Sequence, residues 1–385
     1  MSNSSFGDAN ELTADELAGA RLARSQIAPA AVERPPAPPV EELAPAPGGS
    51  GDEPGSLSRR FLRPQTLVSF LLAIAILVFF VRGMHIDVHA VWQNVRRANL
   101  GIYALAFVAF YSGFILRARR WRQMLARVDI DEEHGCNVPS DRGIVEIFLL
   151  SWFANCIVPA KLGDAYRSYL MKRESGSSFS SGLGTIVAER LMDLLVLFLA
   201  MSALGIAVFT DRWRKLSGHE HRQVEQAFVL GLALLVLAAV VLTAMWFSRH
   251  LIERKLPLRV REQYARLHDG VFACLRRPWP FLATSIGIWV LEGVRLYLVT
   301  LALGANVSFE TASFVALMSS LLTTLPITPA GLGVVEVAMT AVFTMTGVNR
   351  SMALSLALMD RLIGYWSIVA VGIILYVRRF RKEVG

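Results

Sequence analysis

The sequence lacks the features by which many soluble enzymes are recognised. It has three cysteines in 385 residues, and their odd number and wide spacing exclude a disulfide framework or a zinc-binding motif. It contains no Gly-x-Ser-x-Gly, no P-loop and no His-Glu-x-x-His. We therefore expect no metal site, no cofactor and no catalytic group of these kinds.

Charge is also scarce, because only 18% of the residues are charged while 54% are hydrophobic. That composition leaves too little polar surface to cover a soluble globule. Lys and Arg exceed Asp and Glu, 39 to 31, and much of the excess falls in short loops. This pattern is typical of anchoring against anionic headgroups, so we expect a multi-pass protein of the cell inner (cytoplasmic) membrane and no nucleic-acid partner.

The N-terminal part has neither a signal peptide nor a span. Residues 1–58 are rich in Pro, Ala and Gly, which predicts a disordered cytoplasmic tail. We assign residues 59–385 to one transmembrane domain.

Six segments are long and apolar enough to span a bilayer. They are residues 65–82, 100–117, 182–208, 227–247, 281–303 and 353–377. Two further apolar regions, 144–172 and 312–346, are interrupted by Pro and Gly, which predicts two re-entrant helical hairpins. The residues assigned to the helix breaks are Pro159, Gly163, Pro326, Pro329, Gly331 and Gly333. The fold class is therefore all-α, a polytopic membrane helix bundle.

Basic residues predict the orientation. They gather before the first span, after the second, around the first break, in 249–277 and at the C-terminal end. The positive-inside rule then places both termini in the cytoplasm, with one hairpin entering from each side of the membrane.

The two breaks resemble each other in sequence. The run from Pro159 to Gly163 matches that from Pro329 to Gly333, and an acid-Arg-Leu triplet follows each. Arg190 lies 27 residues after Gly163, and Arg361 lies 28 residues after Gly333. We interpret residues 100–208 and 281–377 as an inverted-topology repeat, the architecture of many transporters. The alternative is a pair of structural kinks.

Charged residues inside the apolar segments predict the site. A charge near the bilayer centre costs about 2.5–3.5 kcal/mol or more, so these residues must face one another or water. The predicted substrate-binding set is Asn155, Asp164, Arg167, Glu189, Arg190, Asp193, Glu292, Arg295, Glu336, Asp360 and Arg361. The intramembrane cations are all Arg, whose planar fork suits a phosphate, so we expect an anionic or phosphate-bearing lipid headgroup. The alternative is that the pairs are ion locks between helices.

One loop carries an amphipathic pattern. Residues 258–275 place apolar side chains at helical spacing among charges, which predicts a helix on the cytoplasmic surface. The basic and aromatic stretch 117–125 is similar. Each stretch either recruits anionic lipid or anchors the orientation.

The phrases FANCIVPAKLGDAYRSYLM, IVAERLMDLLVLFL and LLTTLPITPAGLGVVEVAMT resemble the lysylphosphatidylglycerol synthetase transmembrane-domain family of flippase-like proteins. In its best-known members, this region is thought to move an aminoacylated phospholipid between leaflets and precedes a soluble aminoacyl transferase. Because residue 385 follows the last span closely, we expect a stand-alone member without that transferase.

Three functions fit these observations. The first is translocation of a phospholipid or lipid-linked anion, without enzymatic activity. The second is a membrane lipid-modifying transferase that uses Asp164, Glu189 or Glu336 as a base. The third is a non-catalytic scaffold that binds enzymes of lipid or isoprenoid biosynthesis.

The topology gives the first testable prediction. A reporter fused after Gly385 and one inserted near Lys255 should both report the cytoplasm, whereas one near Glu310 should report the outside. Reporter activity in intact cells measures each location. A cytoplasmic signal near Glu310 would remove the inverted repeat.

Overall fold

The computed structural model describes residues 87–157, 162–209, 257–324 and 328–384, together with residues 226, 229, 232, 233, 236, 237 and 239–247. All of them belong to the second of two units, residues 54–385. Every regular element in this part of the chain is a helix, which confirms the all-α prediction. The predicted tail, the span 65–82, Pro159 and Pro326 lie outside the described residues, as do seven of the 21 residues of the span 227–247.

Four helical stretches in the described residues are long and apolar enough to cross a membrane. They are α5 (Leu100–Ala126), α8 (Phe179–Phe209), α11 (Trp279–Ala302) and the stretch Arg350–Arg379. The last stretch consists of α14 (Arg350–Arg361), the π-helical turn η4 (Leu362–Trp366) and most of α15 (Ser367–Val384). These helices confirm four of the six predicted spans and a multi-pass membrane protein.

One boundary was wrong. The sequence predicted that the second span ends at Arg117 and that residues 117–125 form a surface stretch, but α5 continues to Ala126. Arg120 is 1% exposed and Trp121 is fully buried. The basic residues were interpreted as loop markers, whereas carboxylates on other helices neutralise Arg117 and Arg120 inside the bundle.

The two interrupted regions each consist of a pair of short helices. The first pair is α6 (Asp141–Ile157) and α7 (Gly163–Ser175), and the second is α12 (Phe309–Thr324) and α13 (Val334–Met345). A 3-10 turn, Pro329–Gly331, lies between α12 and α13. Since the longest of the four has 17 residues, each is shorter than the roughly 30 Å of a hydrocarbon core at about 1.5 Å per residue.

Contacts place the ends of the first pair together. The start of α6 is tied to the end of α5 by the ion pair of Asp141 with Arg122, 2.9 Å apart. The end of α7 is tied to α15 by Glu174 and Arg379, 2.5 Å apart. The chain therefore enters and leaves the α6–α7 pair near the C-terminal ends of α5 and α15.

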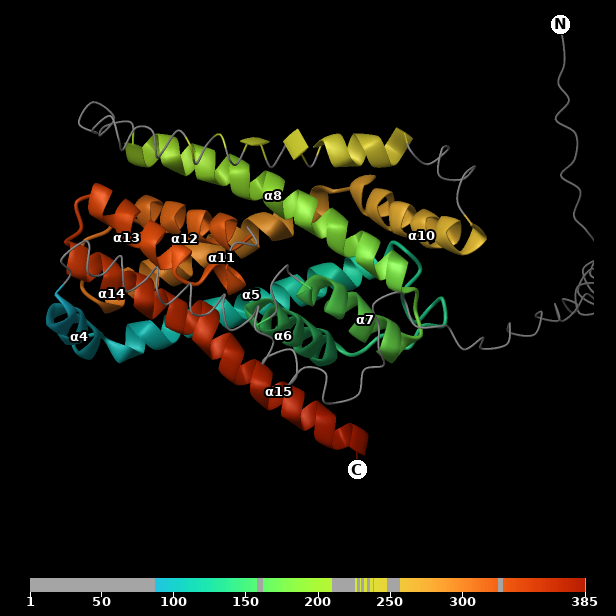
Figure 1. Cartoon of the computed structure of the whole chain (residues 1–385), viewed down its shortest axis with the longest axis horizontal. Coiled ribbons are helices and arrows are strands. Elements are labelled where there is room, and N and C mark those ends of the chain that lie inside the picture. Colours follow the sequence, from blue (N-terminus) through green and yellow to red (C-terminus); the bar gives the residue numbers. More distant parts are fainter. Residues whose placement is uncertain are drawn as a thin grey trace, which may run out of the picture. The chain divides into compact units, whose positions relative to one another are not determined.

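The second pair begins at the other end of the long helices. Phe314 near the start of α12 contacts Phe209 at the end of α8, with ring centroids 5.5 Å apart. The Asn99 N–H at the start of α5 donates to the Ala302 carbonyl at the end of α11, at 2.7 Å. Figure 1 shows α7 and α13 toward opposite ends of the bundle. The re-entrant character and the membrane orientation of the two pairs stay predictions.

The predicted amphipathic helix is α10 (Leu258–Leu275), and its bounds agree with the prediction. It runs beside the first half of α8 (Figure 1). The backbones approach closely, because a Cβ added at Gly184 would lie 2.4 Å from the Leu267 carbonyl oxygen. Val271 and Cys274 of its apolar stripe are buried, whereas Val260 is exposed. A second short helix, α4 (Val88–Arg96), packs on α14.

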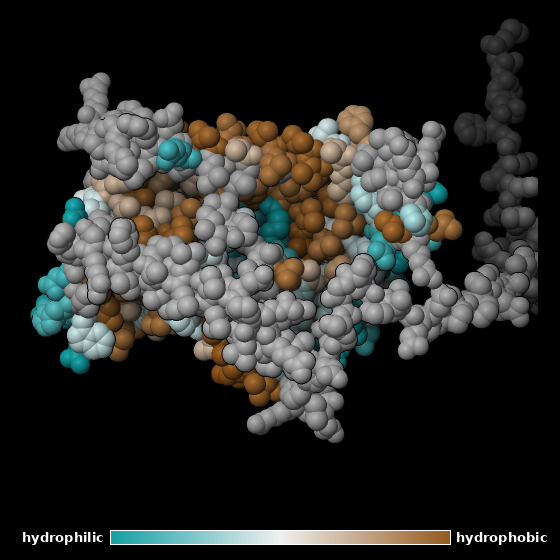
Figure 2. All heavy atoms as spheres, in the orientation of Figure 1, coloured by the Kyte–Doolittle hydropathy of each residue, from teal (hydrophilic) through white to brown (hydrophobic). Residues whose placement is uncertain are grey.

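Large apolar side chains cover much of the outside of the bundle, as the brown surface in Figure 2 shows. Exposed examples on the long helices are Leu105, Val108, Leu199, Ile206, Ile286, Val290, Ile373 and Ile374. The charged side chains of the same helices lie mostly inside. The bundle thus has apolar side chains on its outside and charged side chains in its interior. A protein surrounded by hydrocarbon requires this distribution.

The close approach of α8 and α10 gives the second prediction. Gly184→Ala should lower the melting temperature in detergent, because the new methyl group meets backbone that must shift, and such overpacking costs about 1–3 kcal/mol. Gly287→Ala is the matched control, since a Cβ there meets only Leu116, at 4.0 Å. Equal melting temperatures for the two variants would contradict the backbone contact.

Candidate functional site

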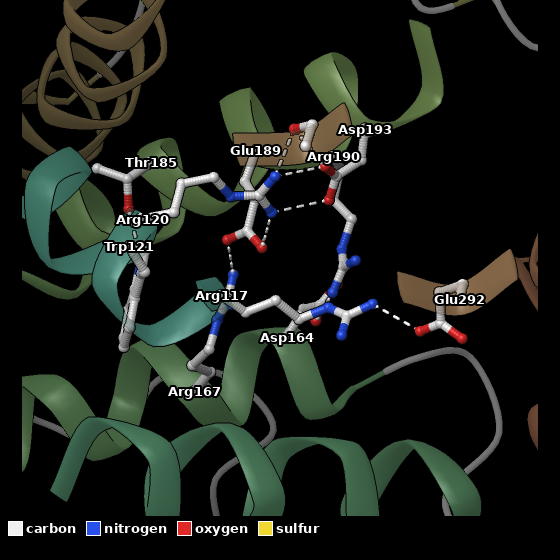
Figure 3. Close-up of polar contacts among 11 residues, drawn as sticks. Arg117, Arg120, Trp121, Asp164, Arg167, Thr185, Glu189, Arg190, Asp193 and Glu292 are labelled. Carbon is white, nitrogen blue, oxygen red and sulfur yellow. Dashed lines mark hydrogen bonds and ion pairs between the residues drawn. The ribbon is translucent and has the colours of Figure 1, made fainter. Parts of the chain in front are cut away.

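Twelve charged residues lie in or beside the candidate spans and breaks, and the described contacts join them into ion pairs. Six are arginines and six are carboxylates. They are Arg117, Arg120, Arg167, Arg190, Arg295, Arg361, Asp164, Glu189, Asp193, Glu292, Glu336 and Asp360. We call this set the charge network, and Figure 3 shows the part of it around α5, α7 and α8.

Arg120 of α5 joins the two carboxylates of α8. Its Nη2 lies 2.8 Å from Glu189 Oε1, and its Nη1 lies 2.6 Å from Asp193 Oδ1. The Ser285 hydroxyl of α11 also donates to Asp193, at 2.8 Å. Glu189 and Asp193 therefore share one face of α8, as the sequence predicted, and their partners come from three other helices, α5, α7 and α11.

Arg167 of α7 is fully buried beneath this cluster. Its Nη2 donates to Glu189 Oε2 at 2.6 Å. Its guanidinium lies over the rings of Trp121 and Phe148, at 4.7 and 4.3 Å from their centroids. Such contacts stabilise a desolvated cation and fix its position. Arg167 thus links α7 to α8 in this structure, and its predicted role in substrate binding stays a prediction.

A second cluster joins α5, α11 and α14. Arg117 donates to Glu292 at 2.9 Å, and Glu292 pairs with Arg295 one turn along α11, at 3.1 Å. Arg295 then reaches Asp360, at 2.8 Å. The predicted pairing of Glu292 with Arg295 is confirmed. All four side chains are less than one-tenth exposed.

Side chains satisfy the backbone at the first break. The Gly163 N–H donates to Asn155 Oδ1 at 2.9 Å, and the Ser151 hydroxyl donates to the Gly163 carbonyl at 2.8 Å. A Cβ at Gly163 would lie 2.1 Å from the Ser151 carbonyl oxygen. Asn155, which was predicted to line the substrate path, therefore holds the break in this structure.

Arg190 pairs with the first turn of α7. Its Nε and Nη2 donate to the two oxygens of Asp164, at 2.9 and 2.8 Å. The sequence left open a lock with Asp193 or Glu189, but those carboxylates bind Arg120 instead. Arg190 and Asp164 thus form a bidentate pair at the N-terminus of a short helix.

The second break is held by Arg361. Ala330, Gly331 and Gly333 have φ values of 47°, 72° and 85°, the left-handed region that favours glycine. The Gly333 N–H donates to Glu336 Oε2 at 2.7 Å. Arg361 donates to Glu336 Oε1 at 3.0 Å and to the Ala330 carbonyl at 2.8 Å. The ion pair of Glu336 and Arg361 therefore satisfies two backbone groups of the unwound segment.

The contacts of the two predicted repeat halves follow a similar pattern. Arg190 and Arg361 each pair with a carboxylate in the first turn after a break, 26 and 25 residues earlier in the chain. The preceding carboxylates, Glu189 and Asp360, each bind an arginine of the first long helix of their unit, on α5 and α11. These similar contacts favour the repeat of residues 100–208 and 281–377, which stays a prediction.

The ion pairs at the two breaks differ in how much of their side chains is exposed. The side chain of Arg190 is 41% exposed and that of Asp164 is 18% exposed. For Arg361 and Glu336 the values are 7% and 3%. Figure 2 shows hydrophilic atoms reaching the surface amid apolar side chains in the middle of the bundle. Of the twelve charged side chains, Arg190 is the most accessible to a ligand.

Sequence reasoning missed Arg117 and Arg120. A charge count could have found them, because the predicted set held four arginines and six carboxylates. Two further cations were needed to neutralise it. Ser285, which was also missed, gave no such signal.

Residues 66–372 match the family model described as the lysylphosphatidylglycerol synthase TM region. The chain belongs to this family.

Sequence similarity to curated membrane proteins agrees with this family assignment. A UPF0104 membrane protein of Methanocaldococcus jannaschii is 33% identical over 58% of this chain and 93% of its own length. Another from Methanothermobacter thermautotrophicus is 23% identical over 80% of this chain and 92% of its own length. The glycosyltransferase AglD of Haloferax volcanii is 24% identical over 78% of this chain but 52% of its own length.

The buried cluster on α8 gives the third prediction. Arg120→Ala should lower the free energy of unfolding of this protein by about 3–5 kcal/mol. The substitution leaves Asp193, and one oxygen of Glu189, without the buried cation that they share. Arg122→Ala is the control, since Arg122 pairs with the exposed Asp141. Melting temperatures in one detergent measure both. A fall of equal size in the two variants would contradict the assigned pairing.

Proposed function

We propose that this protein is a transporter and not an enzyme, and that it moves a phosphate-bearing lipid between the leaflets of an inner membrane. The observation that carries the proposal is the partly exposed Arg190, which presents a guanidinium beside a broken helix in a membrane-embedded bundle. A buried ion lock has no need of that exposure.

The geometry of the pair suits exchange with a phosphate. Arg190 uses Nε and Nη2 to hold both oxygens of Asp164. A phosphate offers the same fork two oxygens at similar spacing. The helix dipole at the N-terminus of α7, where Asp164 lies, also favours an anion. A lipid headgroup can therefore take the place of the carboxylate on Arg190.

In our proposal, the two repeat halves supply a route for the headgroup. The headgroup binds at Arg190, passes along the charged interior and leaves at Arg361, while its acyl chains stay in the bilayer. The correspondence of the break pairs and the separation of α7 and α13 support this route (Figure 1). Family membership also supports a lipid substrate.

The two other functions have less support. The match to the glycosyltransferase AglD covers about half of that protein, so its name does not assign a transfer reaction to this chain. Each carboxylate that a transferase would use as a base, Asp164, Glu189 or Glu336, is held by an arginine. A scaffold would not require these buried pairs.

Transport gives the fourth prediction. Arg190→Lys should reduce lipid translocation in reconstituted vesicles at least tenfold, because lysine keeps the charge and loses the bidentate fork, which contributes about 1.5–3 kcal/mol in hydrogen bonds to charged groups. The melting temperature should change little, since Arg190 is partly exposed.

Arg122→Lys provides the control for the assay, because Arg122 lies in a surface pair outside the charge network. It should transport as the unmodified protein does. Unchanged translocation by Arg190→Lys would refute the headgroup role and leave Arg190 as a helix lock.

A further inference from the structure

Helix α10 and the residues that follow it carry arginines that take no part in the charge network. We propose that they form a binding site for an anionic phospholipid of the surrounding bilayer, which stays bound as a ligand and is not the transported lipid. This site, which we call the α10 surface, consists of Leu258, Val260, Arg261, Arg266, Arg276, Arg277 and Trp279. The proposal does not depend on translocation.

The arginines of the α10 surface differ from those inside the bundle. All four are exposed, and none of them forms an ion pair within the part of the chain that the structure describes. Each of the six network arginines, in contrast, lies 3.0 Å or less from a carboxylate oxygen. Residues 258–277 contain five arginines and two carboxylates, so this segment has a net charge of +3. Its positive charge is therefore available to an anion.

The apolar stripe of α10 is covered at one end and uncovered at the other. Toward the C-terminus, the helix packs tightly on α8, because a Cβ added at Gly270 would lie 2.8 Å from the Ser181 carbonyl oxygen. Toward the N-terminus, the side chains of Val260 and Leu258 are 46% and 73% exposed. The first turn of α10 therefore presents apolar side chains next to the exposed Arg261.

The position of α10 brings this surface to the end of two candidate spans. It packs on the first turns of α8, and α11 begins at Trp279, shortly after α10 ends at Leu275. The Trp279 side chain is 76% exposed. Aromatic side chains of this kind are enriched where a span meets the lipid headgroups. Phosphates of the bilayer are therefore within reach of the arginines on either side of α10.

The chemistry of the α10 surface fits a lipid of net negative charge. A guanidinium can hold a phosphate by two parallel hydrogen bonds. Exposed apolar side chains among arginines are typical of a helix that lies in the bilayer interface. An acidic protein would match the arginines but would leave Leu258 and Val260 without an acyl-chain region to enter. A choline lipid carries its own cation, so it offers the arginines no net charge.

Lipid-dependent stability of the whole protein tests the proposal, because a ligand that binds the folded state raises the melting temperature. The protein is titrated in one neutral detergent with a glycerol phospholipid, which is anionic, or with a choline phospholipid of the same acyl chains. We expect a saturable rise in melting temperature with the glycerol lipid only. The rise should weaken at higher ionic strength, because salt screens exposed charges.

The combined variant Arg261→Gln and Arg266→Gln should need about 30-fold more glycerol lipid for half of the rise, because each arginine near an anionic surface contributes about fivefold in affinity. Arg142→Gln combined with Lys172→Gln is the matched control. It removes two exposed positive charges from α6 and α7 and should titrate as the unmodified protein does. Equal titrations of the two double variants would overturn the proposal, as would an equal response to the choline lipid.

Arg190→Lys separates this site from the transport site that we propose. It should keep the full rise in melting temperature, because Arg190 is not part of the α10 surface. If Arg190→Lys loses the rise while the α10 double variant keeps it, the glycerol lipid binds at Arg190 and the α10 proposal fails. Failure of the proposed function appears instead in the translocation assay and leaves the α10 titration unchanged.

Discussion

The structure depends on the neutralisation of charge inside an apolar bundle. In lipid, apolar contact between helices gains little, because the surrounding tails are equally apolar. Here ion pairs provide specific links instead: Arg120 joins α5 to α8, and Arg295 joins α11 to α14. Because each pair requires its partner at hydrogen-bond distance, the charges that are expensive to bury also determine which helices are neighbours.

The same constraint shapes the breaks. Unwound backbone inside a membrane must find hydrogen-bond partners within the protein. At the second break, Glu336 accepts from the Gly333 N–H, and Arg361 donates to the Ala330 carbonyl. At the first break, neutral side chains make the corresponding contacts with Gly163, which leaves the Arg190 pair closer to the surface. The more accessible arginine therefore lies at the break whose backbone is satisfied by neutral side chains.

The sequence could predict the helices and a pairing within one helix, Glu292 with Arg295, but not the ion pairs between helices. Composition and Pro-Gly interruptions located four spans and both breaks, since these signals are local. Arg120 and Asp193 are 73 residues apart, and Arg117 and Glu292 are 175 apart, so no local pattern pairs them. Because basic residues were taken as loop markers, the predicted second span ended before α5 does. An excess of two carboxylates in the predicted site was the one trace of the missing arginines.

The two predicted repeat halves are similar in sequence and in contacts, yet their geometry differs. The helix after Arg361 makes a π-helical turn, η4, whereas α8 is α-helical after Arg190. Within that turn Gly364 lies close to Arg295, whose Nη1 would be 3.1 Å from an added Cβ. π-Helical turns are often found at functional sites. In our proposal, one partly exposed and one buried arginine would present the headgroup site to one side only. A lipid translocator of the kind we propose needs such a difference between its halves, because two equally open sites would join the leaflets by a continuous polar path.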